Sequence, residues 1–375
     1  MYKLAASIVI ILSLISVSCK THQYSIESEE NSISVKSFNA KGNGETDDTD
    51  AFKKALSFLK NKSIQVKTES STIAGTGTMY IPSGIYIISS TLDLTGLNGL
   101  QIIGNGKANT ILLYKNEMGQ LFYAGQNINL SIKDLSFENG TIKKLPNNKY
   151  EIKNFSSGTA TAFLWTGQGS NRFLSFKNIG CNSRFNVVWQ FEGNGTHSET
   201  TFINCTVLGA NNVFLFNNQQ SVNHTFYNCS FERNTGKIFF IKAGGYINMY
   251  GGSVILFDDL FYFEPVQSGI GQYNNFYSIN TVRIEMSNNR SKNPINPMIV
   301  NCTQPVNGQI VINSCSNNTD SDINKVYFKP MGDLKIAFNN SNIKGTIDLA
   351  KSNKANISIN GGIANINYIT DKSKN

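Results

Sequence analysis

The sequence predicts an all-β solenoid, a single stack of short β-coils that begins with one helix. A motif of an aromatic residue, a spacer and an asparagine recurs, and Asn178, Asn204 and Asn228 are 26 and 24 residues apart. A period of 20 to 50 residues is typical of repeat architectures. The repeats contain alternating strand patterns and no helical pattern. Charged residues make up only 15% of the chain and Pro only 7 residues, while Gly reaches 31, which favours Asn- and Gly-built turns.

One helix is predicted at residues 49–60, near the start of the stack. Asp47, Asp48 and Asp50 stand where the free N–H groups of a starting helix favour acidic acceptors. Apolar residues then recur at helical spacing and form one stripe: Ala51, Phe52, Ala55, Leu56 and Leu59. We expect this helix to cap the open N-terminal end of the stack, which water would otherwise reach.

The segment at residues 35–113 also contains motifs known from one protein superfamily. It contains FNAKGNGETDDTDAFKKAL, followed by IPSGIYIISSTLDL and LQIIGNGKANTILL. These motifs resemble the N-terminal segment of the pectate lyase superfamily. The resemblance implies a single-stranded, right-handed parallel β-helix with a short N-terminal capping helix, predicted to extend over residues 34–370. It does not specify chemistry, because the same segment precedes lyases, hydrolases and phage tailspikes.

The N-terminal residues predict export from a bacterial cell. Residues 1–18 read as a signal peptide, with Lys3 before an apolar run too short to span a bilayer. The sequence that ends at Cys19 resembles a lipoprotein signal, in which that cysteine becomes lipidated, although Ser16 replaces the usual leucine. Residues 19–33 then predict a flexible tether. We expect a lipoprotein of the cell envelope, at the outer membrane or cell surface, with simple secretion as the alternative.

The remaining five cysteines predict a structural role. An odd number argues against a complete disulfide framework, and no Cys/His spacing predicts a metal site. Cys181, Cys205 and Cys229 are 24 residues apart, twice over. We expect them to form an inward ladder in a dry core, while the three repeated asparagines form a ladder of turns.

The first candidate site combines charges that recur near one period. Asp258 and Asp259 follow Arg233 by about one coil, and Arg283 and Glu285 follow by about another, with Glu264 between them. If these coils stack, Asp258, Asp259 and Glu285 would supply carboxylates for acid–base chemistry on a glycosidic bond. Arg283 would then bind the substrate or serve a lyase, and Glu264 and Arg233 would contact the glycan. The structural alternative is a ladder of surface salt bridges.

A second group lies in the Gly-rich stretch VVWQFEGNGTHSE. Trp189 is predicted to stack on a sugar ring and His197 to contact the substrate from the turn. The alternatives are that Trp189 belongs to the core and that His197 is merely solvated.

These observations favour a cell-envelope carbohydrate-active protein. The net charge of +8 is compatible with an acidic polysaccharide as partner, or with solubility alone. No nucleotide loop, nucleophile elbow or zinc motif is present, so the sequence predicts no cofactor and no nucleic-acid partner; Ca²⁺ would enter only if the protein were a lyase. The Asn-Thr-Asp, Asp-Asp, Gly-His-Gly and Arg-Ile-Lys order of polygalacturonases is also missing.

Two functions therefore stay open. The sequence favours an enzyme, a polysaccharide lyase or glycoside hydrolase, whose outward charges should line a groove with aromatic residues. The alternative is a non-catalytic glycan-binding or structural lipoprotein, whose surface charges should already be paired. Coiled-coil heptads of the kind that form a trimerisation stem are absent, so no particular oligomeric state is predicted.

Overall fold

The computed structural model describes residues 31–67, 72–147, 149–264, 275–286, 297–317, 324–353 and 356–370. The predicted signal peptide, the lipidation site Cys19 and the tether up to residue 30 lie outside these ranges. The residues from Asn31 onward form one compact unit. Its first strand, β1 (Ser32–Ser34), pairs with β5 (Gly77–Tyr80) and includes two residues that the sequence assigned to the tether.

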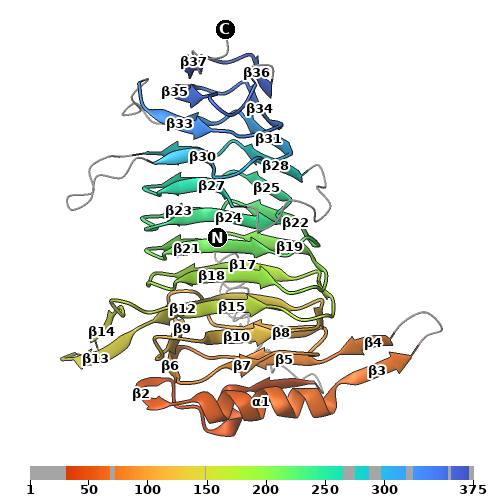
Figure 1. Cartoon of the computed structure of the whole chain (residues 1–375). Coiled ribbons are helices and arrows are strands. Elements are labelled where there is room, and N and C mark those ends of the chain that lie inside the picture. The colour runs from red at the N-terminus through yellow and green to blue at the C-terminus, as the bar shows by residue number, and fades with distance from the viewer. Residues whose placement is uncertain are drawn as a thin grey trace, which may run out of the picture. The chain divides into compact units, whose positions relative to one another are not determined.

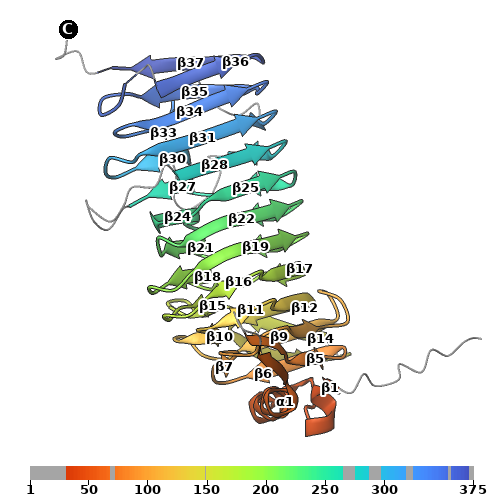
Figure 2. The same ribbon diagram turned by 90° about the vertical axis from the view of Figure 1, so that its right-hand side faces the viewer.

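This unit is a parallel β-helix, as predicted, in which strands of successive coils stack in the order of the sequence (Figures 1 and 2). One wall is an eleven-strand sheet with one strand per coil. Its strands are β7 (Leu92–Asp93), β10 (Gln120–Ala124), β15 (Thr161–Trp165), β18 (Val187–Glu192), β21 (Asn212–Asn217), β24 (Lys237–Ala243), β27 (Asp259–Phe263), β30 (Met298–Cys302), β33 (Val326–Lys329), β35 (Ile343–Asp348) and β37 (Ala364–Ile369).

The other two walls join into a twenty-two-strand sheet through the long strands β12 and β17. One wall contains β1, β5, β8 (Leu100–Ile103), β11 (Asn127–Ile128), β12 (Ser131–Asn139), β16 (Asn171–Arg172), β17 (Ser175–Cys181), β19 (His197–Ile203), β22 (Ser221–Tyr227), β25 (Ile247–Tyr250), β28 (Asn275–Asn280), β31 (Gly308–Asn313), β34 (Leu334–Asn339) and β36 (Ile357–Asn360). The other contains β2 (Asn43–Asp47), β6 (Gly84–Ile88), β9 (Thr110–Tyr114), β20 (Thr206–Leu208), β23 (Ser230–Glu232), β26 (Ser253–Ile255), β29 (Arg283–Glu285) and β32 (Ser316–Asn317).

The predicted helix is α1 (Thr49–Lys62), which follows the short 3-10 helix η1 (Val35–Phe38) and lies across the first coil (Figure 1). Its apolar stripe is buried, and the ring of Phe52 packs edge-on against Tyr86 with centroids 5.5 Å apart. The helix start differs from the prediction in detail. Asp47 accepts the N–H of Thr49 at 3.0 Å, whereas the carboxylate of Asp48 accepts the N–H of Gly42 at 2.9 Å and so braces the preceding turn.

Two antiparallel hairpins project from the stack (Figure 1). They are β3 (Ile64–Lys67) with β4 (Thr72–Gly75), and β13 (Thr141–Leu145) with β14 (Lys149–Lys153). The second hairpin contacts the first coil, because Tyr150 donates its hydroxyl to the Asn43 carbonyl at 3.0 Å and Lys144 pairs with Glu45 at 2.9 Å.

The core contains ladders of rings from successive coils of the eleven-strand sheet. Phe163, Trp189, Phe214, Phe239 and Phe261 occupy one register position, and neighbouring rings stack with centroids 4.9 to 6.2 Å apart. The predicted turn ladder is confirmed. Asn178, Asn204 and Asn228 all have a left-handed backbone, with φ between 51° and 53°, and Asn228 donates its amide to Asn204 at 3.1 Å.

The prediction of a cysteine ladder is partly wrong. All three cysteines are buried and reduced, and Cys205 and Cys229 each directly follow the left-handed asparagine of their turn. Cys181 instead lies three residues after Asn178 and pairs in register with Val207. The spacing misled because the coil between Asn178 and Asn204 is two residues longer than the next one.

Candidate functional site

A cluster of polar and aromatic side chains lies on the outer face of the eleven-strand sheet, on strands β24, β27 and β30. The register pairs Lys237 with Asp259 and Phe240 with Tyr262. Strand alternation sends Phe239 and Phe261 into the core and therefore turns Phe240 and Tyr262 outward. We name this set the β24–β27 cluster; its members are Lys237, Phe240, Lys242, Asp259, Tyr262, Glu264 and Asn301.

Asp259 is the most buried ionisable group of the cluster, with 9% of its surface exposed. Its Oδ1 accepts a hydrogen bond from the Asn301 amide at 2.9 Å. Burial raises the pKa of the Asp259 carboxyl above its usual value, while the Asn301 hydrogen bond and the charge of Lys237 act in the opposite direction. A carboxyl whose burial favours the protonated form is suited to donating a proton.

Glu264 supplies a second carboxylate directly after β27. Its Oε2 accepts the hydroxyl of Tyr262 at 3.2 Å, and its Oε1 lies 3.5 Å from the ammonium of Lys242. The Glu264 side chain is 42% exposed, so it stays accessible to a ligand. Burial and the neighbouring charge of Glu264 raise the pKa of Tyr262, which keeps its hydroxyl protonated as a donor.

The two outward rings carry cations on their faces. The ammonium of Lys237 lies 4.6 Å from the Tyr262 ring centroid and 5.4 Å from that of Phe240. The ammonium of Lys242 lies 5.1 Å from the Phe240 centroid. Cation–π attraction thus holds two positive charges beside two carboxyl groups and an apolar platform. Such an arrangement can bind an acidic sugar and offer it a proton.

The structure does not bring the whole predicted site together. Arg283 and Glu285 lie on β29 in the other large sheet, where the register pairs Arg283 with Ser253 and Ser316. Asp259 is instead flanked by Lys237 and Met298. The prediction that Asp259 and Arg283 stack is therefore wrong: their 24-residue separation matches the coil period, but they occupy different walls.

The other residues of the first predicted group lie beside these two walls. Asp258 directly precedes β27, and its carbonyl accepts the N–H of Met298 at 2.7 Å. Arg233 occupies a left-handed turn position after β23, with φ of 52°. Arg283 and Glu285 form an ion pair with each other along one strand, and not the ladder between coils that the structural alternative predicted. Of the predicted residues, the cluster therefore retains Asp259 and Glu264.

The predictions that Trp189 and His197 contact the substrate are also wrong, because both side chains are fully buried and neither can reach a substrate in this structure. Trp189 stacks in the core ladder, 4.9 Å from Phe214. His197 donates from Nε2 to the Glu192 carbonyl at 2.7 Å and accepts at Nδ1 from the Asn171 amide at 3.1 Å. Burial lowers the pKa of His197 to about 4, so it is neutral near pH 7.

Sequence reasoning missed Lys237, Phe240, Lys242, Tyr262 and Asn301. A usable pattern was present for the aromatic members. The stretches KIFFIK at 237 and DLFYF at 259 align without a gap, and each has an aromatic residue at the outward position. Asn301 could not be found this way, because 39 residues separate it from its register partner Tyr262.

The described residues contain neither a cluster of metal ligands nor a membrane-spanning helix. No group of three or more His, Cys, Asp and Glu side chains in these ranges is arranged to hold a metal ion. Within the same part of the chain, no helix is long and apolar enough to cross a membrane.

Comparison with known proteins places the first part of the chain in a family. Residues 32–244 match the family model described as rhamnogalacturonase A/epimerase, pectate lyase-like. A search of curated protein sequences found no match.

Solved structures resemble the chain at low identity. The catalytic unit of a GH87 α-1,3-glucanase from Streptomyces thermodiastaticus is 12% identical (TM-score 0.43), over 92% of this chain and 71% of the glucanase unit. The Dettilon tailspike protein is 10% identical (TM-score 0.49), over 90% of this chain and 68% of the tailspike. ORF18 of Geobacillus virus E2 is 14% identical (TM-score 0.43), and the match covers 91% of this chain but only 61% of ORF18. At these identities, nothing about substrate follows.

Proposed function

The chain belongs to the pectate lyase-like rhamnogalacturonase A/epimerase family, and from this premise we propose that it is a carbohydrate-active enzyme that cleaves a long, acidic polysaccharide at the β24–β27 cluster. The observation that carries the proposal is the buried Asp259 carboxyl with its raised pKa. Its hydrogen bond to Asn301, the register partner of Tyr262, links it to the face that holds a second carboxylate, two lysines and two aromatic rings.

Hydrolysis is the reaction that this arrangement supports best. Glycoside hydrolases use one protonated and one ionised carboxyl group on either side of the scissile bond. Asp259 would protonate the leaving oxygen, and Glu264 would act as the carboxylate partner. Phe240 and Tyr262 would support a sugar ring, while Lys237 and Lys242 would bind uronate carboxylates.

A lyase would instead need a base that removes the proton beside the uronate carboxyl. The raised pKa of Tyr262 makes its phenolate scarce at neutral pH. Arg283, which the sequence suggested for a lyase, lies on the other large sheet and is paired with Glu285. Hydrolysis is therefore favoured over elimination.

A non-catalytic glycan-binding role is the second candidate. One observation favours it: the described residues include four surface charge pairs, namely Lys144–Glu45, Arg172–Glu199, Lys242–Glu264 and Arg283–Glu285. Paired surface charges are the property expected of a binding or structural protein on this scaffold.

The decisive experiment incubates the purified protein with acidic and neutral polysaccharides. Reducing ends and the ultraviolet absorbance of unsaturated uronates are followed together. New reducing ends without that absorbance indicate hydrolysis, whereas absorbance indicates elimination. Glycan binding with neither product would overturn the proposal of an enzyme and would support the glycan-binding role.

Variants then test the residues. Asp259→Asn should lower kcat by about 10²- to 10⁴-fold, the usual contribution of a general acid. Glu264→Gln should lower kcat as well, because it removes the second carboxylate. Glu285→Gln changes a carboxylate on the other large sheet and should leave the rate unchanged. An unaltered rate in Asp259→Asn would exclude this carboxyl as the acid.

The cellular localisation is a separate proposal. We place the protein in the bacterial cell envelope, anchored through a lipid on Cys19, because residues 1–19 resemble a lipoprotein signal. Mass spectrometry of the mature N-terminal peptide tests this. A diacylglyceryl-modified Cys19 supports the anchor, and an unmodified N-terminus elsewhere supports simple secretion.

A further inference from the structure

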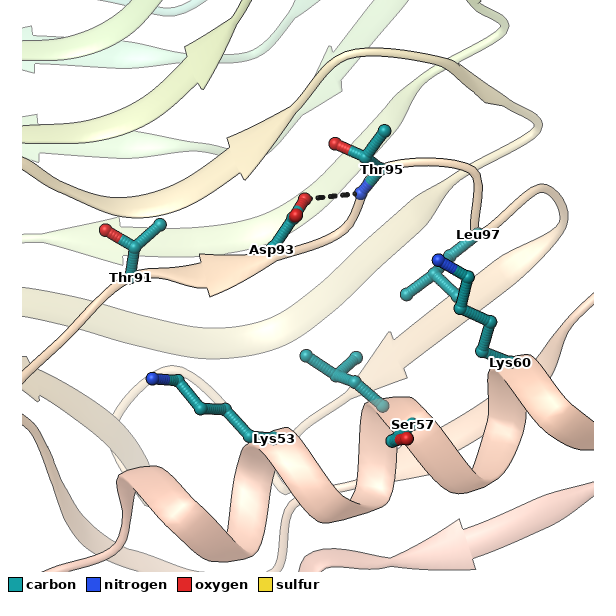
Figure 3. Close-up of a pocket in the computed structure, with 8 residues that line it drawn as sticks. Lys53, Ser57, Lys60, Thr91, Asp93, Thr95 and Leu97 are labelled. Atoms are coloured by element: carbon teal, nitrogen blue, oxygen red, sulfur yellow. Dashed lines mark hydrogen bonds between the residues drawn. The ribbon is translucent and has the colours of Figure 1, made fainter.

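A separate pocket lies at the N-terminal end of the stack, between α1 and the first strand of the eleven-strand sheet (Figure 3). Its volume is about 370 Å³, which falls in the lower part of the roughly 300–1,000 Å³ range of small-molecule sites. It is lined by Lys53, Leu56, Ser57, Lys60, Thr91, Asp93, Thr95 and Leu97.

Two lysines of α1 give the pocket its charge. Lys53 and Lys60 are seven residues apart, so they project from the same helix face about 10 Å apart along the axis. Both ends of the pocket in Figure 3 therefore carry an ammonium group, Lys53 below Thr91 and Lys60 beside Leu97. Lys53 donates to the hydroxyl of Ser90 at 2.7 Å, which fixes its position and leaves further N–H donors for a ligand.

The rest of the lining is suited to a sugar. Leu56 and Leu97 are buried and form an apolar floor, while Ser57, Thr91 and Thr95 supply hydroxyl groups. Asp93 accepts the N–H of Thr95 at 2.8 Å through one carboxylate oxygen. Its other oxygen can accept a sugar hydroxyl. Two cations against one carboxylate leave the pocket with a net positive charge.

The pocket is distinct from the β24–β27 cluster, although both lie along the eleven-strand sheet. The register runs from Asp93 to Tyr123 and continues coil by coil to Tyr262. Six strand spacings of about 4.8 Å separate β7 from β27, or about 29 Å. A disaccharide is too short to occupy both places.

We propose that this pocket binds a short acidic saccharide, with its carboxylates on Lys53 and Lys60 and one apolar ring face on Leu56 and Leu97. The assignment of the ligand class rests on the proposed function. The two ammonium groups match a disaccharide that carries a carboxylate at each end better than a single small anion. The pocket would hold the part of a long acidic glycan that lies far from the reacting bond.

The test measures binding of digalacturonate to the full protein by calorimetry at low salt, with cellobiose as the neutral disaccharide. Wild-type protein should bind digalacturonate and not cellobiose. Lys53→Gln and Lys60→Gln should each weaken binding about tenfold or more, the effect of losing one charge-assisted hydrogen bond. Lys54→Gln removes an exposed charge from the same helix outside the pocket and should leave the affinity unchanged.

Other results would overturn the assignment. Absence of digalacturonate binding, equal binding of cellobiose, or full affinity in the Lys53→Gln/Lys60→Gln variant each excludes the pocket as an acidic-sugar site. Binding that is lost in Lys237→Gln and kept in the double variant would place the ligand at the β24–β27 cluster, which refutes the pocket but leaves the proposed function intact. Circular dichroism checks that the exposed substitutions keep the fold.

Discussion

Two buried histidines should make the stack sensitive to mild acid. His197 and His224 are fully buried on successive coils, and His224 lies between the rings of Phe191 and Phe216, with centroids 4.9 and 4.8 Å away. Burial lowers the pKa of His197 to about 4 and that of His224 to about 3, from an ordinary value of 6.5. Between these pKa values and 6.5, the two histidines are therefore protonated in the unfolded chain and neutral in the folded chain.

The size and direction of the effect follow from these values. The stabilisation that these two histidines contribute is fully present above the unfolded pKa of 6.5. It is lost as the pH falls toward 4 and then 3, because only the unfolded state gains protons in that window. Between pH 7 and pH 5, each histidine lowers the free energy of unfolding by about 2 kcal/mol, from about 1.4 kcal/mol per pH unit below the unfolded pKa. The pair should contribute about 4 kcal/mol.

Urea unfolding at pH 7 and pH 5 measures this loss. Trp165 and Trp189 are buried in the same core, so their fluorescence reports its exposure. His224→Ile copies Ile247, the residue that pairs with His224 one coil further on. Between pH 7 and pH 5, the free energy of unfolding of this variant should fall by about 2 kcal/mol less than that of the wild-type protein. An equal loss in both proteins would refute the reasoning, since other groups would then cause the pH dependence.

Three further substitutions test the turns and the cluster. Gly42→Ala should lower the melting temperature, at a cost of about 1–3 kcal/mol, because Gly42 has φ of 60° and an added Cβ would lie 2.6 Å from the Tyr86 ring. Asn228→Ala should lower the urea midpoint more than Asn228→Gly, since both lose the Asn204 bond but only alanine is strained at φ of 51°; equal losses would contradict a backbone origin. Tyr262→Phe should lower kcat while KM stays constant, because it removes the donor to Glu264 and keeps the ring; a change confined to KM would assign the hydroxyl to binding.

The fold could be predicted from the sequence because its determinants are local. The asparagines at 178, 204 and 228 mark a turn that recurs on every coil there, and Asn tolerates the left-handed backbone that this turn requires. The helix boundary was also readable, since the apolar stripe from Ala51 to Leu59 is one buried face. Each of these features depends on neighbours in the sequence, which a single chain displays.

The site could be predicted only in part, because it depends on register across coils of unequal length. Strand β24 begins 22 residues before β27, but β30 begins 39 residues after it, so a fixed period fails beyond Asp259. The repeat period also does not show which wall of the β-helix a residue belongs to. For this reason a separation of one period wrongly predicts that Arg283 and Asp259 share a face. The burial of Trp189 and His197 was equally hidden, since an aromatic residue on a strand can face either side.

The register, once known, also explains why the β24–β27 cluster is a stronger candidate than the Arg283–Glu285 pair. Both places combine positive and negative side chains on an outer sheet face. The Arg283 side chain is 68% exposed and paired with Glu285, two residues further along the strand, so solvent screens both charges. Asp259 is held at 9% exposure between strands that place Lys237, Asn301 and Tyr262 around it. The burial that raises the pKa of the Asp259 carboxyl therefore separates this candidate acid from a surface salt bridge.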